Sequence, residues 1–111
     1  MSTDIQERID TKEGLKAPTK WNILAINNDL TSFDEVVFIL VQAFNMSESV
    51  AAEITVKVDR EGKAKCNPKP MSKGIAEAQL AKVNEVKSRL AQMIPSRGSQ
   101  IMMLKFIIKE D

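Results

Sequence analysis

A cluster of small polar side chains follows an apolar stretch early in this chain of 111 residues. Asn27, Asn28 and Asp29 come directly after the sequence Ile-Leu-Ala-Ile, and Thr31 lies two residues further on. Such polar groups, fixed by rigid neighbours at the end of a core strand, are commonly used to recognise a small charged group. The same residues would also suit an ordinary turn, because Asn and Asp bond their own backbone and tolerate left-handed conformations.

The other residues that could do chemistry give little support for catalysis. Asp29 could pair with Asp34 or Glu35, but acids in the first turn of a helix ordinarily serve as caps and dipole partners. Cys66 is the only cysteine, and the chain has no histidine to act as its base, so a buried structural thiol is expected. The four glycines are too scattered for a phosphate-binding loop. We therefore expect no enzyme activity, no metal site and no cofactor.

The composition also bounds the class of protein. Lys and Arg number 16 against 15 Asp and Glu, so the clustered basic excess of a nucleic-acid-binding surface is missing. No apolar run is long enough to cross a bilayer, and the sequence does not begin with the apolar core of a signal peptide. The sequence predicts a soluble, cytoplasmic domain that binds neither nucleic acid nor membrane.

Apolar spacing predicts the elements on either side of the polar cluster. Residues 23–26 form a short apolar strand before it. After it, apolar residues between 33 and 44 recur at the i, i+3, i+4 and i+7 positions that form one face of a helix. Ser32 and Glu35 fit a capping box at the start of this helix, and Thr31 is a competing cap. The polar residues are thus predicted to lie where a strand leads into a helix.

Two further helices are predicted from similar patterns. One begins after Ser47 and ends at Gly62, which suits the left-handed position that terminates many helices. The other begins at Ser72 or Gly74 and continues to about residue 93. Acids alternate with lysines along this last helix, which predicts a face exposed to water. That face comprises Lys73, Glu77, Lys82, Glu85 and Lys87.

Two more strands complete the predicted fold. Residues 63–66 alternate polar and small side chains, residues 95–98 have the composition of a turn, and residues 101–108 are rich in strand-forming side chains. The order β-α-α-β-α-β predicts an α+β domain over residues 21–111, with three helices packed on one face of a three-stranded, mainly antiparallel sheet. Residues 1–20 contain too little apolar surface to offset the entropy of ordering them, and a mobile tail is predicted there.

Two motifs together resemble the ClpS family, adaptors that deliver substrates with amino-terminal degradation signals to the Clp unfoldase–protease. Residues 27–31 have the sequence NNDLT, where the family has Asn-Asp-Asp-x-Thr followed by Pro. Residues 58–66 have the sequence VDREGKAKC, where the family has Val-His-x-x-Gly-x-Ala-x-Cys. The similarity is most specific between residues 21 and 66, and it implies the same small α+β domain behind a mobile tail.

The resemblance implies a pocket that accepts the α-ammonium of a substrate's first residue and buries the side chain of that residue. The implied acceptors are Asn27, Asn28, Asp29, Thr31 and Asp59. The implied pocket walls are Phe33, Val36, Thr55, Val58, Met103 and Leu104. The implied partners are a Clp-type AAA+ unfoldase and substrate proteins with bulky apolar N-terminal residues, and no catalysis by the adaptor is implied.

Several positions depart from the family pattern. Asn28 and Asp59 replace an Asp and a His, so the carboxylate has moved from one side of the expected pocket to the other. Ser32 replaces a Pro, and Phe33 and Thr55 each replace a Met. Gly74 and Gln79 stand where the family carries a Glu and a Lys that face the unfoldase. These changes leave open an alternative, a diverged ClpS-like interaction protein that sequesters or modulates a protease or another protein without binding amino-terminal residues.

Overall fold

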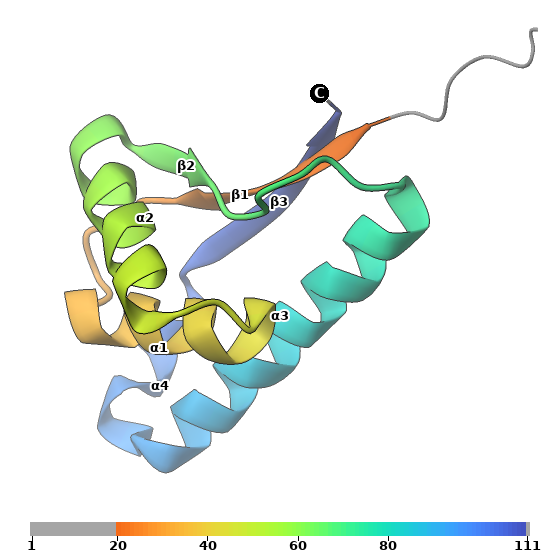
Figure 1. Cartoon of the computed structure of the whole chain (residues 1–111). Coiled ribbons are helices and arrows are strands. Elements are labelled where there is room, and N and C mark those ends of the chain that lie inside the picture. The colour runs from red at the N-terminus through yellow and green to blue at the C-terminus, as the bar shows by residue number, and fades with distance from the viewer. Residues whose placement is uncertain (1–19, 111) are drawn as a thin grey trace, which may run out of the picture.

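A three-stranded antiparallel sheet and the helices packed on it form the fold (Figure 1). The computed structural model describes residues 20–110, so the tail predicted over residues 1–20 lies outside the described residues apart from Lys20. The elements follow the order β1 (Trp21–Ile26), α1 (Phe33–Phe44), α2 (Glu48–Glu61), β2 (Lys63–Lys65), α3 (Lys73–Met93), a 3-10 helix η1 (Pro95–Arg97), α4 (Gly98–Met102) and β3 (Lys105–Glu110). The predicted α+β class and the antiparallel sheet are confirmed.

The first strand lies in the middle of the sheet, in the order β2-β1-β3. Along its whole length β1 pairs with β3, so that residue 21 is opposite residue 110 and residue 26 is opposite residue 105. Strand β2 pairs only with the second half of β1. Alternate residues of β1 face the helices, and Ile23 and Ala25 are therefore fully buried. The polar residues after Ile26 accordingly leave the sheet from its central strand.

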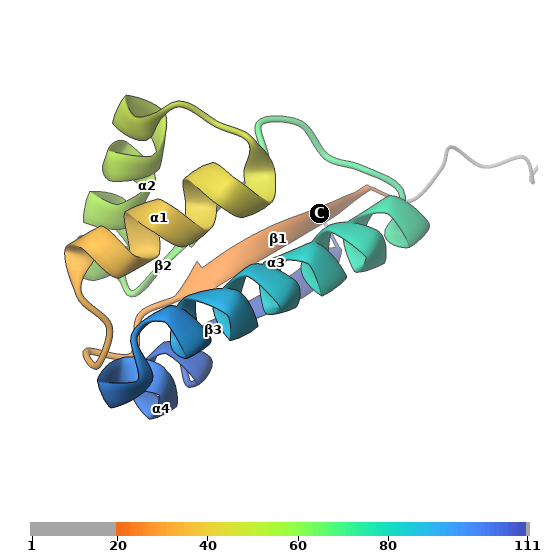
Figure 2. The same cartoon turned by 90° about the horizontal axis from the view of Figure 1, so that it is seen from below.

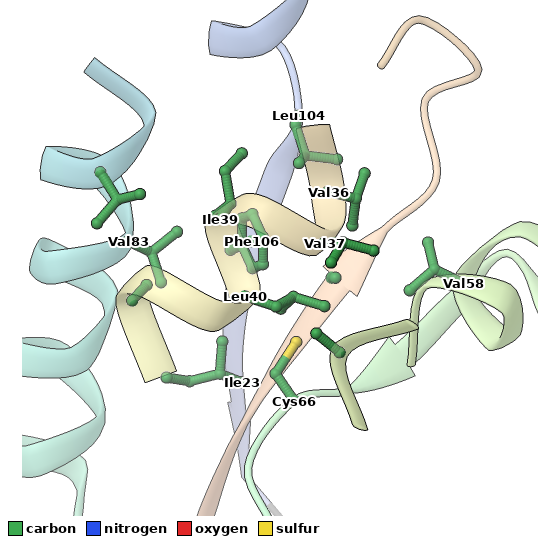
Figure 3. Close-up of a cluster of buried hydrophobic side chains, with 14 of the residues drawn as sticks. Ile23, Val36, Val37, Ile39, Leu40, Val58, Cys66, Val83, Leu104 and Phe106 are labelled. Carbon is green, nitrogen blue, oxygen red and sulfur yellow. The ribbon is translucent and has the colours of Figure 1, made fainter. Parts of the chain in front are cut away.

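Helix α1 is packed between α2 and α3, as Figure 2 shows from below the molecule. The side chains of Ile39 and Leu40 are completely buried, and Figure 3 places them among side chains from the strands and the other helices. Phe38 and Ile39 widen the apolar face set by the i, i+3, i+4 spacing, so that this helix can be covered on two sides. Because α1 is held on both sides, its first turn is a rigid base for the preceding loop.

The helix ends next to the polar loop are fixed by local hydrogen bonds. Ser32, not Thr31, is the N-cap of α1: the backbone N–H of Glu35 donates to Ser32 Oγ at 3.2 Å, and the N–H of Ser32 donates to Glu35 Oε1 at 2.8 Å. Gly62 ends α2 with φ of 88°, a left-handed conformation that glycine adopts without a Cβ clash. Its carbonyl accepts the N–H of Asn27 at 2.9 Å, which joins the end of α2 to the end of β1.

The predicted last strand was placed wrongly. Residues 101–108 were expected to be a strand after a turn, but residues 95–102 form η1 and α4, and β3 spans Lys105–Glu110. The fold therefore has a short additional helix beyond the three predicted. Ile101 and Leu104 are both buried and are three residues apart, a spacing that a single helical turn brings to one side. A short apolar run does not distinguish helix from strand by its periodicity, and Pro95 at the first position of η1 is a helix-start signal.

A candidate pocket at the end of the central strand

A cavity of about 260 Å³ lies beside the loop that leaves β1. The loop, the first turn of α1, the last two turns of α2 and one residue just before β3 form its walls. The lining residues are Asn27, Thr31, Ser32, Phe33, Val36, Thr55, Val56, Val58, Asp59 and Leu104. Hydrogen-bond acceptors from the loop and from the end of α2 thus share one cavity with apolar side chains.

The polar part of the lining includes Asn27, Thr31 and the exposed Asp59, together with Ser32, the cap of α1. The side chain of Asn27 is oriented by Asp29: its Oδ1 accepts the Asp29 N–H at 3.2 Å, and its Nδ2 donates to Asp29 Oδ1 at 3.1 Å. Asp29 itself has φ of 59°, a left-handed conformation that Asp tolerates better than most residues. Asp29 is exposed and does not line the cavity, so it supports an acceptor and is not one of the lining acceptors.

Asn28 organises the loop from within. Its Oδ1 accepts three hydrogen bonds, from the backbone N–H of Leu30 at 3.0 Å and from the N–H and the hydroxyl of Thr31 at 3.3 and 2.7 Å. Asn28 is not among the lining residues, and its Nδ2 is buried with no hydrogen-bond partner in the described part of the chain. Because the Thr31 hydroxyl gives its proton to Asn28, the oxygen of that hydroxyl remains an acceptor.

The apolar part of the lining is formed by buried side chains. Val36, Val58 and Leu104 are almost completely covered, and Figure 3 shows them on α1, on α2 and on the segment just before β3. Thr55 is buried too, and its hydroxyl donates to the carbonyl of Ala51 at 2.7 Å. The hydroxyl proton of Thr55 is therefore already used within α2 and is not available to a ligand.

Two exposed apolar side chains stand at the rim. Phe33 is 48% exposed and Val56 is 46% exposed, although both line the cavity. Sequence reasoning identified Phe33 but missed Val56. Val56 lies three residues before Asp59 on α2, and this helical spacing could have placed the two side chains together. Met103, proposed as a wall, is 61% exposed and does not line the cavity, whereas its neighbour Leu104 does.

The structure thus brings together most of the residues chosen from the sequence. Those that line one cavity are Asn27, Thr31, Phe33, Val36, Thr55, Val58, Asp59 and Leu104. Asn28, Asp29 and Met103 lie outside the lining, and Ser32 is a lining residue that was recognised only as a cap.

Glu35 links the start of α1 to the C-terminal part of the chain. Its buried carboxylate receives two bonds of 2.8 Å from the guanidinium of Arg97, one from Nε to Oε2 and one from Nη2 to Oε1. Hydrogen bonds from Arg97, with smaller contributions from Ser32, lower the pKa of Glu35 to about 2 against the opposing effect of burial. Glu35 is therefore a carboxylate throughout the neutral and mildly acidic range.

This lowered pKa predicts how acid destabilises the fold. Because the folded-state pKa lies below the ordinary value of 4.5, the carboxylate of Glu35 stabilises the fold above pH 4.5, and its contribution is lost as the pH falls toward 2. Arg97 is partly exposed to water, which screens the pair, so we expect Glu35→Gln to cost about 1 to 2 kcal/mol at pH 7. Urea unfolding at pH 7 and pH 3 should show a smaller difference between the two proteins at pH 3. An equal difference at both pH values would contradict this assignment.

Two other buried groups have structural roles. Lys87 was expected on the water-exposed face of α3, but it is buried, and its Nζ donates to the carbonyl of Leu104, a residue of the pocket wall. Burial lowers the pKa of Lys87. Cys66 is buried as expected, and burial raises the pKa of its thiol to about 12, so it stays protonated and unreactive.

Within residues 20–110 no helix has both the length and the apolar character needed to span a membrane. Nor does this part of the chain contain a group of three or more Cys, Asp or Glu residues placed to hold a metal ion.

The fold and the cavity define a small α+β binding domain, whose pocket suits a charged group joined to an apolar side chain. Residues 16–94 match the family described as ATP-dependent Clp protease adaptor protein ClpS. The chain belongs to the ClpS family. It is 35% identical over 81 residues to the ATP-dependent Clp protease adapter protein ClpS of Shewanella loihica, covering 73% of this chain and 76% of that protein. The ClpS of Xanthomonas oryzae pv. oryzae is 34% identical over 82 residues, or 74% of each chain.

A solved structure has the same fold. The structure of Agrobacterium tumefaciens ClpS2 bound to L-phenylalaninamide matches with a TM-score of 0.59, and the match covers 86% of this chain and 100% of the other. The two sequences are 17% identical, so this likeness concerns the fold. Membership of the family and the α+β architecture predicted from the sequence are both confirmed.

Proposed function

We propose that this protein is a cytoplasmic adaptor, without catalysis of its own, that binds the amino-terminal residue of substrate proteins. It delivers those substrates to a Clp-type AAA+ unfoldase–protease. The observation that carries this proposal is the cavity at the end of β1, in which Asn27, Thr31 and Asp59 supply acceptors beside an apolar floor. The chain belongs to a family of Clp adaptors, and the related ClpS2 has been solved with an amino acid amide bound.

In this function the polar side of the cavity receives the α-ammonium of the substrate. Asp59 supplies the negative charge, and the oxygens of Asn27 and Thr31 accept further hydrogen bonds, because an ammonium taken out of water needs such partners. Asp29 and Asn28 act indirectly, Asp29 by orienting Asn27 and Asn28 by holding Thr31.

The apolar side of the cavity receives the side chain of the same residue. Val36, Val58 and Leu104 form a buried floor together with Thr55. Phe33 at the rim extends the apolar surface outward. A bulky apolar first residue is therefore favoured over a charged one, whose head group would lose water without finding a partner on the floor.

Titration with peptides that differ only in their first residue tests this function. We expect peptides that begin with Phe or Leu to bind best, with a graded preference because one methylene of misfit is worth about 1 to 3 kcal/mol. Fluorescence anisotropy would measure the affinities, with an N-acetylated Phe peptide as the control that lacks the ammonium. Equal binding of peptides that begin with Phe, Glu and Lys would rule out the pocket. It would instead favour a ClpS-like protein that sequesters or modulates another protein without reading its amino terminus.

A further inference from the structure

One arginine from the C-terminal part of the chain, Arg97, is hydrogen-bonded both to the loop before α1 and to the first turn of α1. Nη2 of Arg97 donates to the backbone carbonyl of Leu30 at 2.7 Å, while Nε and Nη2 hold the carboxylate of Glu35. The same carboxylate accepts the N–H of Ser32 at 2.8 Å. A single guanidinium thus connects the loop, the N-cap and the first turn of α1. We refer to Arg97, Glu35 and the Leu30 carbonyl as the arginine clasp.

We propose that Arg97 is a positioning residue for the amino-terminal-residue pocket. It holds the loop of residues 27–32 in the conformation that places Asn27 and Thr31 on the polar side of the cavity. This inference rests on the proposed function for its effect on binding, whereas its effect on the loop can be observed without any ligand.

The remaining hydrogen bonds of the loop explain why such a residue is needed. Those made by the side chains of Asn27 and Asn28 stay within the loop and span at most three residues. The N–H of Asn27 anchors one end of the loop to Gly62. At the other end, the bond from Arg97 to Leu30 connects the loop to a residue 67 positions away. Without that bond, the hydrogen bonds that tie the loop to the rest of the fold would be those at its two ends, Asn27 and Ser32.

The chemistry of the clasp suits arginine in particular. The planar guanidinium can bind both oxygens of a carboxylate and still donate to a third acceptor, whereas a lysine ammonium is a point charge without this fork. The buried carboxylate of Glu35 also needs a cation, since an unpaired buried charge is costly. The cap of α1 also differs from the family pattern. Ser32 stands where that pattern has Pro, which has no backbone N–H. The N–H of Ser32 therefore needs an acceptor, and Glu35 provides it.

The test combines peptide affinity with amide hydrogen exchange. Arg97→Met should weaken binding of a Phe-initial peptide roughly tenfold, as expected if only about a tenth of the molecules keep the competent loop. The amides of Leu30 and Thr31 should exchange faster, while the amide of Ala25 in β1 should not change. Arg89→Met is the matched control, because Arg89 is an exposed residue of α3 outside the clasp and should leave both measurements unchanged.

A double variant guards against simple unfolding. Glu35→Gln combined with Arg97→Met leaves no unpaired carboxylate, and Gln can still complete the capping box. It should fold, bind about tenfold more weakly and show the same faster loop exchange.

A purely structural role of Arg97 would lower the melting temperature while leaving the affinity of the folded protein unchanged, and that result would overturn the inference. Unchanged loop exchange would overturn it as well. If the parent protein does not discriminate first residues, the proposed function fails, but the exchange data still decide whether the clasp holds the loop.

Discussion

Replacing Asp59 with alanine should weaken the binding of Phe-initial peptides by about tenfold to a hundredfold, which corresponds to roughly 1.5–3 kcal/mol for a charge-assisted hydrogen bond. Asp59 is the only acid in the cavity lining, so its removal leaves the substrate ammonium with neutral acceptors. The fold should be unaffected or slightly more stable, because an acid near the C-terminal end of α2 opposes the helix dipole. Anisotropy titration and urea unfolding of the same samples would measure both effects.

Two further variants sharpen this experiment. Glu53→Ala removes an exposed acid from the same helix outside the cavity and should bind like the parent. Asn28→Asp combined with Asp59→His recreates the arrangement of the family pattern and should restore binding. The change at Asn28 also removes a buried amide donor that has no partner within residues 20–110. If Asp59→Ala binds as well as the parent does, the relocated carboxylate has no part in recognition.

Ile39→Ala should be among the most destabilising single changes in the helical layer, at about 2–5 kcal/mol of unfolding free energy. Its side chain is fully buried on α1, the helix packed between α2 and α3, so truncation leaves a cavity that neighbours on both sides cannot easily fill. Urea unfolding would measure the loss. Ile75→Ala is the matched control: Ile75 on α3 is 61% exposed, and we expect a change within about 0.5 kcal/mol. A cost for Ile39→Ala as small as that of the control would contradict the packing described for α1.

The parts of the fold that sequence reasoning predicted correctly are those with local signals. The capping box at Ser32, the glycine that ends α2 and the apolar spacing of α1 each lie within a few residues of the structure they determine. The region from 95 to 108 lacked such a signal. Its apolar residues suit a strand and a short helix equally well, and burial of Ile101 and Leu104 on one side decided the outcome.

The candidate site was predictable to a similar extent and for similar reasons. Most of the lining residues on the loop, on α1 and on α2 could be predicted, because they lie in or beside the two motifs at residues 27–31 and 58–66. Leu104 and Met103 were both proposed, and only packing against the core distinguishes the buried neighbour from the exposed one. Arg97 could not be found in this way. It is 62 residues from Glu35, and no local pattern links an arginine in a predicted turn to a helix cap.

The pairing of β1 with β3 has a consequence for the order in which the protein matures on the ribosome. The central strand is made early, yet its full-length partner is the last element of the described fold, with residue 21 opposite residue 110. Until that partner emerges, one edge of β1 is unpaired, and the cavity lacks Leu104. Closing so long a loop is entropically costly and typically comes late in folding. A nascent chain therefore has the helices and caps around the cavity before it has the complete cavity lining.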